Sequence, residues 1–183
     1  MADTHHSLHA VEAPGLSVWL DSDMRVASLR YFARDGSFVQ KVQASIGPLP
    51  DPLCATRGVP LSGESAILAW CSPTETLLLC ADEALLTRLE SDLASAKDGC
   101  LVVQTGGTRV MRARGARVAD LFARIGGQGV LPGLGEARRS RLAEIAVLAI
   151  QVQIDETLLI VERVYAEHLL DWMRVSATDL EIS

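Results

Sequence analysis

Two stretches of the chain read almost alike, and this repetition constrains the fold more than any other feature of the sequence. They are residues 64–96 and 144–177. In each, an apolar run, a polar turn, a second apolar run and an amphipathic helical pattern follow one another, and the Glu-Thr-Leu-Leu of residues 75–78 recurs at residues 156–159. A repeat of this size indicates a duplicated supersecondary unit, because a single unit of this kind cannot bury its apolar face alone.

The repeat extends toward the N-terminus of each copy. Before the first copy, the pattern predicts a strand at 25–32 and a helix at 38–46; before the second, it predicts a strand at 108–114 and a helix at 116–125. Each half therefore has the order β-α-β-β-α. We expect an α+β fold of two pseudo-symmetric ferredoxin-like halves, with antiparallel sheets and helices packed on one face.

Local signals predict where these elements begin and end. Ser37 and Asp82 are expected to cap the first two helices, and Gly47 to end the first. The apolar strand at 100–104 is expected to form a hairpin with the following strand through Thr105-Gly106-Gly107. The last helix is expected to turn its large apolar side chains inward, namely Tyr165, Leu169, Trp172 and Met173.

The length of the chain suits one domain. At 183 residues, it can bury roughly 70% of the surface of its unfolded state. Residues 1–20 include His5, His6 and His9 and show no periodicity, so we expect a flexible N-terminal tail, which would not pre-orient metal ligands. We expect residues 21–183 to form a single duplicated domain, with halves at about 25–98 and 100–178.

The composition argues against several classes of protein. A net charge of −6 disfavours a nucleic-acid partner. No apolar run approaches the roughly 18 residues that cross a bilayer, and the N-terminus does not resemble a signal peptide. We therefore expect no membrane association and a cytoplasmic location. The four cysteines have no C-x-x-C spacing, which is typical of reduced, buried thiols.

Arginine is concentrated in the second half. The planar guanidinium suits carboxylate and phosphate groups and buried interfaces. A candidate partner interface therefore comprises Arg109, Arg112, Arg114, Arg117, Arg138, Arg139 and Arg141. The alternative is an ordinary solvated surface in which arginine is the default cation.

The sequence contains no recognisable catalytic motif: no P-loop, dinucleotide fingerprint, nucleophile elbow or H-E-x-x-H occurs. The glycine-rich segment 126–135 follows a predicted helix, so it is interpreted as a helix stop and connector rather than a phosphate loop. We expect a structural role for His168, and we expect Glu75 and Glu156 to accept hydrogen bonds from turn amides. We therefore predict no catalytic, cofactor-binding or metal-binding residue in this chain.

Several segments of the chain occur in an informative order. They are Leu29-Arg30 followed by Gly47-Pro48-Leu49-Pro50, then Ser72-Pro73-Thr74-Glu75-Thr76-Leu77-Leu78, then Thr105–Val110 with Arg114–Leu121, then Leu131-Pro132-Gly133, and last Glu162–Ala166 through Trp172. In order and spacing these resemble the gamma subunit of heterotetrameric sarcosine oxidase, within the aminomethyltransferase-like, folate-binding fold group. The resemblance covers roughly residues 25–178.

The resemblance implies a non-catalytic subunit of a complex that oxidatively demethylates sarcosine or a related N-methyl amine and passes the methylene group to tetrahydrofolate. In that family FAD, FMN, NAD and tetrahydrofolate belong to other subunits, so the implied partners are flavin-binding and folate-binding chains. The family's D-x-S is here Gln104-Thr105-Gly106. The aspartate that contacts the pterin in active aminomethyltransferases is therefore missing, which argues against autonomous folate chemistry.

Two other functions stay open. The chain could be a stand-alone folate-binding or pterin-binding module, as the fold group suggests. It could also be a homo-oligomeric regulatory or interaction protein of the duplicated ferredoxin-like kind.

Overall fold

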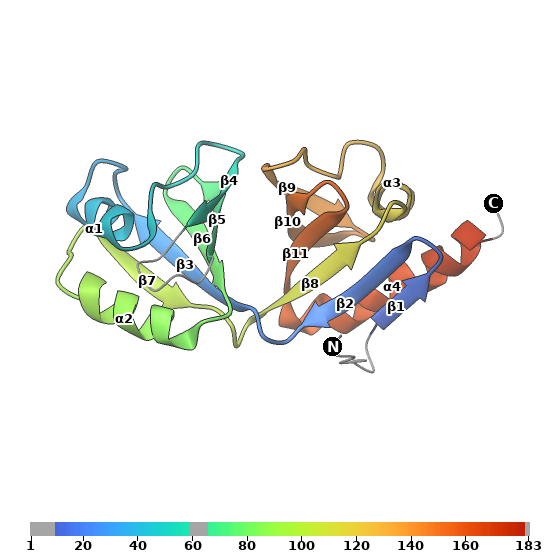
Figure 1. Ribbon diagram of the computed structural model, residues 1–183, viewed down its shortest axis with the longest axis horizontal. Helices are drawn as coiled ribbons and strands as arrows, with labels where there is room; N and C mark the ends of the chain where they lie inside the picture. The colour runs from blue at the N-terminus through green and yellow to red at the C-terminus, as the bar shows by residue number, and fades with distance from the viewer. Residues whose placement is uncertain (1–9, 59–65, 182–183) are drawn as a thin grey trace.

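In a computed structural model, which describes residues 10–58 and 66–181, the chain folds into two antiparallel sheets flanked by helices (Figure 1). The strands are β1 (Ala10–Ala13), β2 (Leu16–Asp21), β3 (Arg25–Tyr31), β4 (Ala55–Gly58), β5 (Ala66–Ser72), β6 (Glu75–Cys80), β7 (Gly99–Val103), β8 (Thr108–Arg114), β9 (Ala137–Leu142), β10 (Ile145–Gln153) and β11 (Glu156–Glu162). The helices are α1 (Ser37–Ile46), α2 (Glu83–Leu93), α3 (Val118–Gly126) and α4 (Arg163–Glu181).

The two sheets repeat one topology. The five-stranded sheet has the order β4-β5-β6-β3-β7, and the six-stranded sheet, in the same direction, has the order β9-β10-β11-β8-β2-β1. The predicted α+β fold of two ferredoxin-like halves is thereby confirmed. Two further strands, β4 and β9, occupy corresponding edges and were not predicted. β9 reads Ala-Arg-Arg-Ser-Arg-Leu and shows no alternation of apolar and polar residues. An edge strand buries little of its surface, so it does not need such a pattern.

The elements of the first half form as the local signals predict, except for one cap. Asp82 accepts a hydrogen bond from the Ala84 amide at the start of α2, and Gly47 ends α1 with a φ of 97°. Ser37 does not cap α1. Asp98, from the segment before β7, accepts hydrogen bonds from the Ser37 hydroxyl and the Phe38 amide instead. These bonds, above all that from Ser37, lower the pKa of Asp98.

The two halves exchange strands. β2 and β3 are consecutive in sequence but lie in different sheets, and the same is true of β7 and β8. β2 pairs with β8 of the second half, while β7 pairs with β3 of the first. Figure 1 shows the two connecting segments crossing between the sheets. The halves therefore cannot separate unless the β1–β2 hairpin leaves the six-stranded sheet and β7 leaves the five-stranded sheet.

Two predictions are corrected by this exchange. Residues 10–13 and 16–21, expected in a flexible tail, form the β1–β2 hairpin at the edge of the six-stranded sheet. The expected hairpin of 100–104 with 108–114 does not exist, although Gly107 and Thr108 do donate to the Gln104 carbonyl in a turn. The glycines permit the turn, but the strands diverge because each finds a more extensive partner in a different sheet. Residues 1–9, with the three N-terminal histidines, lie outside the described part of the chain.

Each sheet carries helices on its outer face, and the inner faces of the two sheets share a third core. The outer clusters are built around fully buried side chains such as Phe38 of α1 and Phe122 of α3. The inner cluster joins Val26 and Leu79 of one sheet to Ile150 and Leu158 of the other. The inner faces therefore pack together, and the molecule has three apolar layers.

The sheets are also tied together where β4 meets the loop before β9. The Ala55 amide donates to the Gly135 carbonyl at 2.8 Å, and the Ala137 amide donates to the Leu53 carbonyl at 2.8 Å. The glycine-rich segment thus acts as a connector, and Gly127 ends α3 with a φ of 85°. None of the helices in the described ranges is long and apolar enough to cross a membrane.

The inward face of the last helix differs from the prediction. Leu169 and Met173 of α4 are fully buried, with Ala166, Leu170 and Ala177 beside them. Tyr165 and Trp172 are each 48% exposed. The apolar pattern of α4 is wider than the stripe that the sheet covers, so periodicity alone does not decide which apolar residues turn inward.

Candidate functional site

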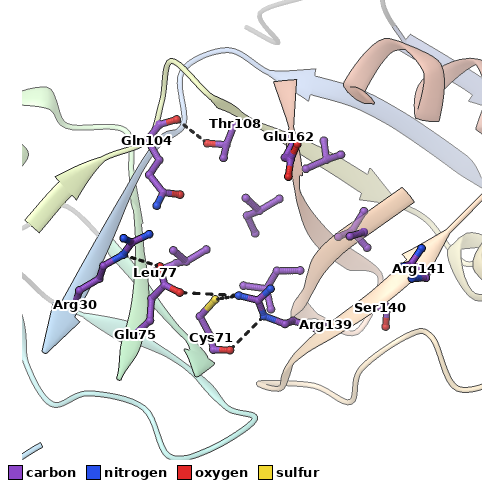
Figure 2. A pocket seen from close by; sticks show the side chains of 15 residues that line it. Arg30, Cys71, Glu75, Leu77, Gln104, Thr108, Arg139, Ser140, Arg141 and Glu162 are labelled. Atoms are coloured by element: carbon purple, nitrogen blue, oxygen red, sulfur yellow. Dashed lines mark hydrogen bonds and ion pairs between the residues drawn. The ribbon is translucent and has the colours of Figure 1, made fainter. Parts of the chain in front are cut away.

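A cleft lies between the two sheets, on the side where the inner core opens to solvent. It has a volume of about 540 Å³. Figure 2 shows side chains reaching into it from both sheets. Its polar lining comprises Arg30, Cys71, Glu75, Gln104, Thr108, Arg139, Ser140, Arg141 and Glu162, and apolar residues such as Leu77, Leu148 and Ile160 form its walls.

Glu75 lies at the centre of a hydrogen-bond network on the five-stranded sheet. Antiparallel pairing sets Arg30 of β3 opposite Glu75 of β6. The Ser28 hydroxyl donates to Glu75 Oε1 at 2.5 Å, and Arg30 Nε donates to the same oxygen at 3.4 Å. Burial alone would raise the pKa of Glu75, but hydrogen bonds from Ser28 and Cys71 and the Arg30 charge outweigh it and lower the pKa. The carboxylate is therefore ionised at neutral pH.

Arg139 bridges the two sheets across the cleft. It lies on β9 of the six-stranded sheet and donates to the Cys71 sulfur at 2.8 Å and to the Cys71 carbonyl at 3.3 Å (Figure 2). Its guanidinium is also 3.9 Å from Glu75. Burial raises the pKa of the Cys71 thiol, the Glu75 charge adds to this, and Arg139 opposes it. The thiol therefore stays protonated at neutral pH and is a poor nucleophile.

The second half has a corresponding carboxylate, Glu156, with different partners. Arg112 forms ion pairs with Glu156 of β11 and with Asp21 of β2, the latter at 2.7 Å. Their side chains are 24%, 7% and 14% exposed, respectively. Burial alone would lower the pKa of Arg112, but the two carboxylates raise it. This triad links the exchanged strand β2 to the rest of its sheet, so its role is structural.

The carboxylate predictions are wrong about the partners. Glu75 and Glu156 accept hydrogen bonds from side chains on neighbouring strands rather than from turn amides. Each glutamate is the first residue of its strand and is already paired with a residue of the neighbouring strand. Glu75 lies opposite Arg30, and Glu156 lies opposite Arg114.

The structure divides the seven candidate interface arginines among separate places. Arg139 and Arg141 line the cleft. Arg112 is taken up by the buried triad, and Arg109 donates to the Thr105 and Thr108 carbonyls at the crossing between the sheets. The others lie near local acceptors at the surface: Arg114 near Asp155, Arg117 near Asp120, and Arg138 at Glu136 and the Gly129 carbonyl. Their role as a partner interface stays a prediction.

No histidine lies beside Cys71 among the residues that line the cleft, and His168 lies exposed on α4. Across the described ranges, no three His, Cys, Asp or Glu side chains gather as a metal site. Two of the cysteines, Cys71 and Cys80, are buried as predicted, whereas Cys100 is exposed because it lies on the edge strand β7.

Sequence reasoning missed Ser28, Arg30 and Cys71 as members of this site. A signal for the first two was available: pairing the predicted strands 25–32 and 75–81 in antiparallel register places Arg30 opposite Glu75. No comparable signal exists for Cys71, because its contact with Arg139 depends on how the two sheets pack together.

Comparison with known proteins places this architecture. The sequence matches no family model and shows no significant similarity to a curated protein. In structure, a chain of heterotetrameric sarcosine oxidase from Corynebacterium sp. U-96, solved in complex with pyrrole 2-carboxylate, is similar with a TM-score of 0.80 and 19% identity over 96% of this chain and 90% of that chain. This chain has the fold of that oxidase chain.

A second solved structure with this fold is the glycine cleavage system aminomethyltransferase T from Bartonella henselae. It is similar with a TM-score of 0.68 and 14% identity, and the match covers 91% of this chain and 46% of that chain. This chain therefore spans about half the length of that enzyme. The likeness to both structures confirms the fold group that the sequence motifs indicate.

Proposed function

We propose that this chain is the non-catalytic, gamma-type subunit of a heterotetrameric complex resembling sarcosine oxidase. In this proposal the complex oxidatively demethylates sarcosine or a related N-methyl amine, and tetrahydrofolate takes up the methylene group. FAD, FMN, NAD and tetrahydrofolate would bind to the other chains. The partners would be flavin-binding and folate-binding subunits.

One observation carries the proposal: the oxidase chain is matched over nearly its whole length, at a TM-score of 0.80. The similarity is thus to a complete chain of about the same extent, whereas less than half of the aminomethyltransferase is matched. The ordered sequence motifs point to the same subunit independently of the coordinates.

The chemistry of the cleft supports a role without catalysis. The carboxylate of Glu75 is held by Ser28 and Arg30, and the Cys71 thiol is kept protonated by burial. A lowered pKa makes the Glu75 carboxylate a weak base, and a raised pKa makes the Cys71 thiol a weak acid, so both are poorly suited to general acid–base catalysis. A complex containing this chain would carry out its chemistry elsewhere.

The proposal is tested by co-expressing the full tagged chain with the proteins that its neighbouring genes encode. We expect a stoichiometric complex that has a flavin absorbance spectrum and oxidises sarcosine. A chain that elutes alone, while the flavoproteins assemble and turn over without it, would contradict the proposal.

A second candidate function, ligand binding in the cleft, is favoured by Arg30, Arg139 and Arg141. Their side chains are 56%, 67% and 69% exposed, so all three can reach a bound anion. A volume of about 540 Å³ lies in the range of small-molecule sites. Titration of the isolated chain with tetrahydrofolate by calorimetry tests this function. Saturable heat that Arg139→Ala abolishes would support it, and no heat at millimolar ligand would reject it.

A further inference from the structure

The two halves differ at one edge. In the six-stranded sheet, β2 is flanked on its outer side by β1. The corresponding strand of the five-stranded sheet is β7, and β3 is its only neighbour among the strands of residues 10–58 and 66–181. The fold therefore holds an additional antiparallel strand on one side and leaves the equivalent position open on the other.

Backbone groups of β7 face this open edge. The Gln104 amide donates to the Val26 carbonyl at 2.8 Å, and the Phe32 amide donates to the Asp98 carbonyl at 3.1 Å. In an antiparallel ladder, hydrogen-bonded and outward-facing residues alternate. Cys100 and Val102 therefore direct their backbone groups to β3, whereas Gly99, Leu101 and Val103 direct theirs outward.

The open edge lacks the usual protection against strand addition. Exposed edge strands are commonly blocked by lysine, proline or a bulge. β7 reads Gly-Cys-Leu-Val-Val and pairs with β3 without a register shift. Val102 and Val103 are 40% and 45% exposed, which is unusual for valines on a sheet. The strand is therefore suited to pairing with another polypeptide.

Two hollows lie where an added strand would place its side chains. Each has a volume of about 360 Å³ and lies between β7 and α2. One is lined by Leu93 and Leu101, the other by Leu86 and Val103. Glu90 lines both and has no cationic partner within the described residues.

The β1 strand shows how such a position is filled. Val11 of β1 is 3% exposed and belongs to the apolar cluster that includes Leu169 of α4. β1 thus pairs with β2 through its backbone and packs on the neighbouring helix through a side chain. An added strand on β7 would pack on α2 in the same way.

We propose that the open edge of β7 binds an extended segment of a partner polypeptide as an antiparallel sixth strand. The segment would place apolar side chains in the two hollows against α2 and a lysine or arginine over Glu90. This inference rests on the proposed function, because it assigns the surface through which the subunit joins its complex. A second copy of this chain is disfavoured, since a two-fold β7–β7 pairing would bring the Glu90 carboxylates of the two α2 helices to the same edge.

Residue-resolved amide hydrogen exchange on the full chain, free and in the co-expressed complex, tests the proposal. In the free chain, the amides of Cys100 and Val102 should be protected, and those of Leu101 and Val103 should exchange rapidly. In the complex, Leu101 and Val103 should slow by at least roughly tenfold, as each gains a hydrogen bond. The amides directed to β3 are the internal control.

A pair of variants at one position tests the same point through affinity. Leu101→Pro removes an outward N–H, which an edge strand tolerates, whereas Leu101→Ala keeps it. Both lose the same packing, so Leu101→Pro should bind the partner at least roughly tenfold more weakly than Leu101→Ala. Val103→Lys, at an exposed site, should weaken binding without unfolding the chain. Ile154→Lys, at the exposed turn between β10 and β11, should leave binding unchanged.

Several results would overturn the proposal. If the complex assembles but Leu101 and Val103 exchange as in the free chain, the edge is not the interface, although the proposed function stands. If no complex forms, both fail. Protection of these amides in the free monomer would assign the edge to the chain's own residues, and concentration-dependent protection with dimer formation would assign it to a second copy.

Discussion

Replacing Arg112 by methionine tests the structural role assigned to the buried triad. The change keeps most of the side-chain volume but leaves Asp21 and Glu156 without their shared cation. Removing one partner of a buried ion pair costs about 3–5 kcal/mol. The side chains of Arg112, Asp21 and Glu156 are still 24%, 14% and 7% exposed, respectively. We therefore expect a loss at the lower end of that range, about 3 kcal/mol. For a domain of this size, that lowers the Tm by about 6–12 °C.

Arg114 provides a matched control on the same strand. Its guanidinium is 3.9 Å from Asp155, and both side chains are about half exposed, at 58% and 45%. A solvated pair of this kind contributes about 0–1 kcal/mol. Arg114→Met should therefore change the free energy of unfolding far less than Arg112→Met, as measured by urea unfolding at pH 7.

Further substitutions test whether the unpaired carboxylates cause the loss of stability in Arg112→Met. Adding Asp21→Asn and Glu156→Gln to Arg112→Met removes the uncompensated charges and should recover most of the stability. Equal losses for Arg112→Met and Arg114→Met, or no recovery on neutralising the carboxylates, would refute the assigned role of the triad.

Three further predictions concern other parts of the molecule. Gly115→Ala should destabilise the fold by several kcal/mol in urea unfolding, because its φ is 124° and a Cβ there would lie 2.2 Å from the Gly15 carbonyl oxygen; an unchanged midpoint would contradict this packing. Because the pKa of Glu75 is lowered from 4.5, its ionised form stabilises the fold above that pH and the contribution disappears as the pH falls through the folded-state pKa. Glu75→Gln should thus cost roughly 1–2 kcal/mol at pH 7, and its stability should converge with that of the unaltered chain as the pH falls below the folded-state pKa. Iodoacetamide followed by peptide mapping should label the exposed Cys100 well before Cys71, whose pKa is raised, and the reverse order would contradict that environment.

The sequence predicts the repeated core of the fold because that part is written in local patterns. The strands and helices of 25–46, 66–93 and 145–179 follow alternation, helical periodicity and capping residues. The strand exchange leaves no such trace. β7 and β8 read as a hairpin in the sequence, and only the packing of two whole sheets decides that they part.

The N-terminal hairpin was missed for a related reason. β1 has four residues and only Val11 as a large apolar side chain, and β2 has partly exposed residues. Short edge strands depend on a preformed neighbour, here β8, rather than on their own propensity. The cleft could be predicted only in part, since Arg30 and Glu75 follow from strand pairing, whereas Arg139 reaches Cys71 from the other sheet.

We propose that this chain acts as one subunit of a flavin-containing complex. Native mass spectrometry of the tagged full chain, purified from its own cells, tests this role. We expect the 19.7 kDa chain to occur in fixed stoichiometry with larger chains whose mass includes bound flavin. Recovery of the chain only as a monomer, or only as multiples of its own mass, would contradict it.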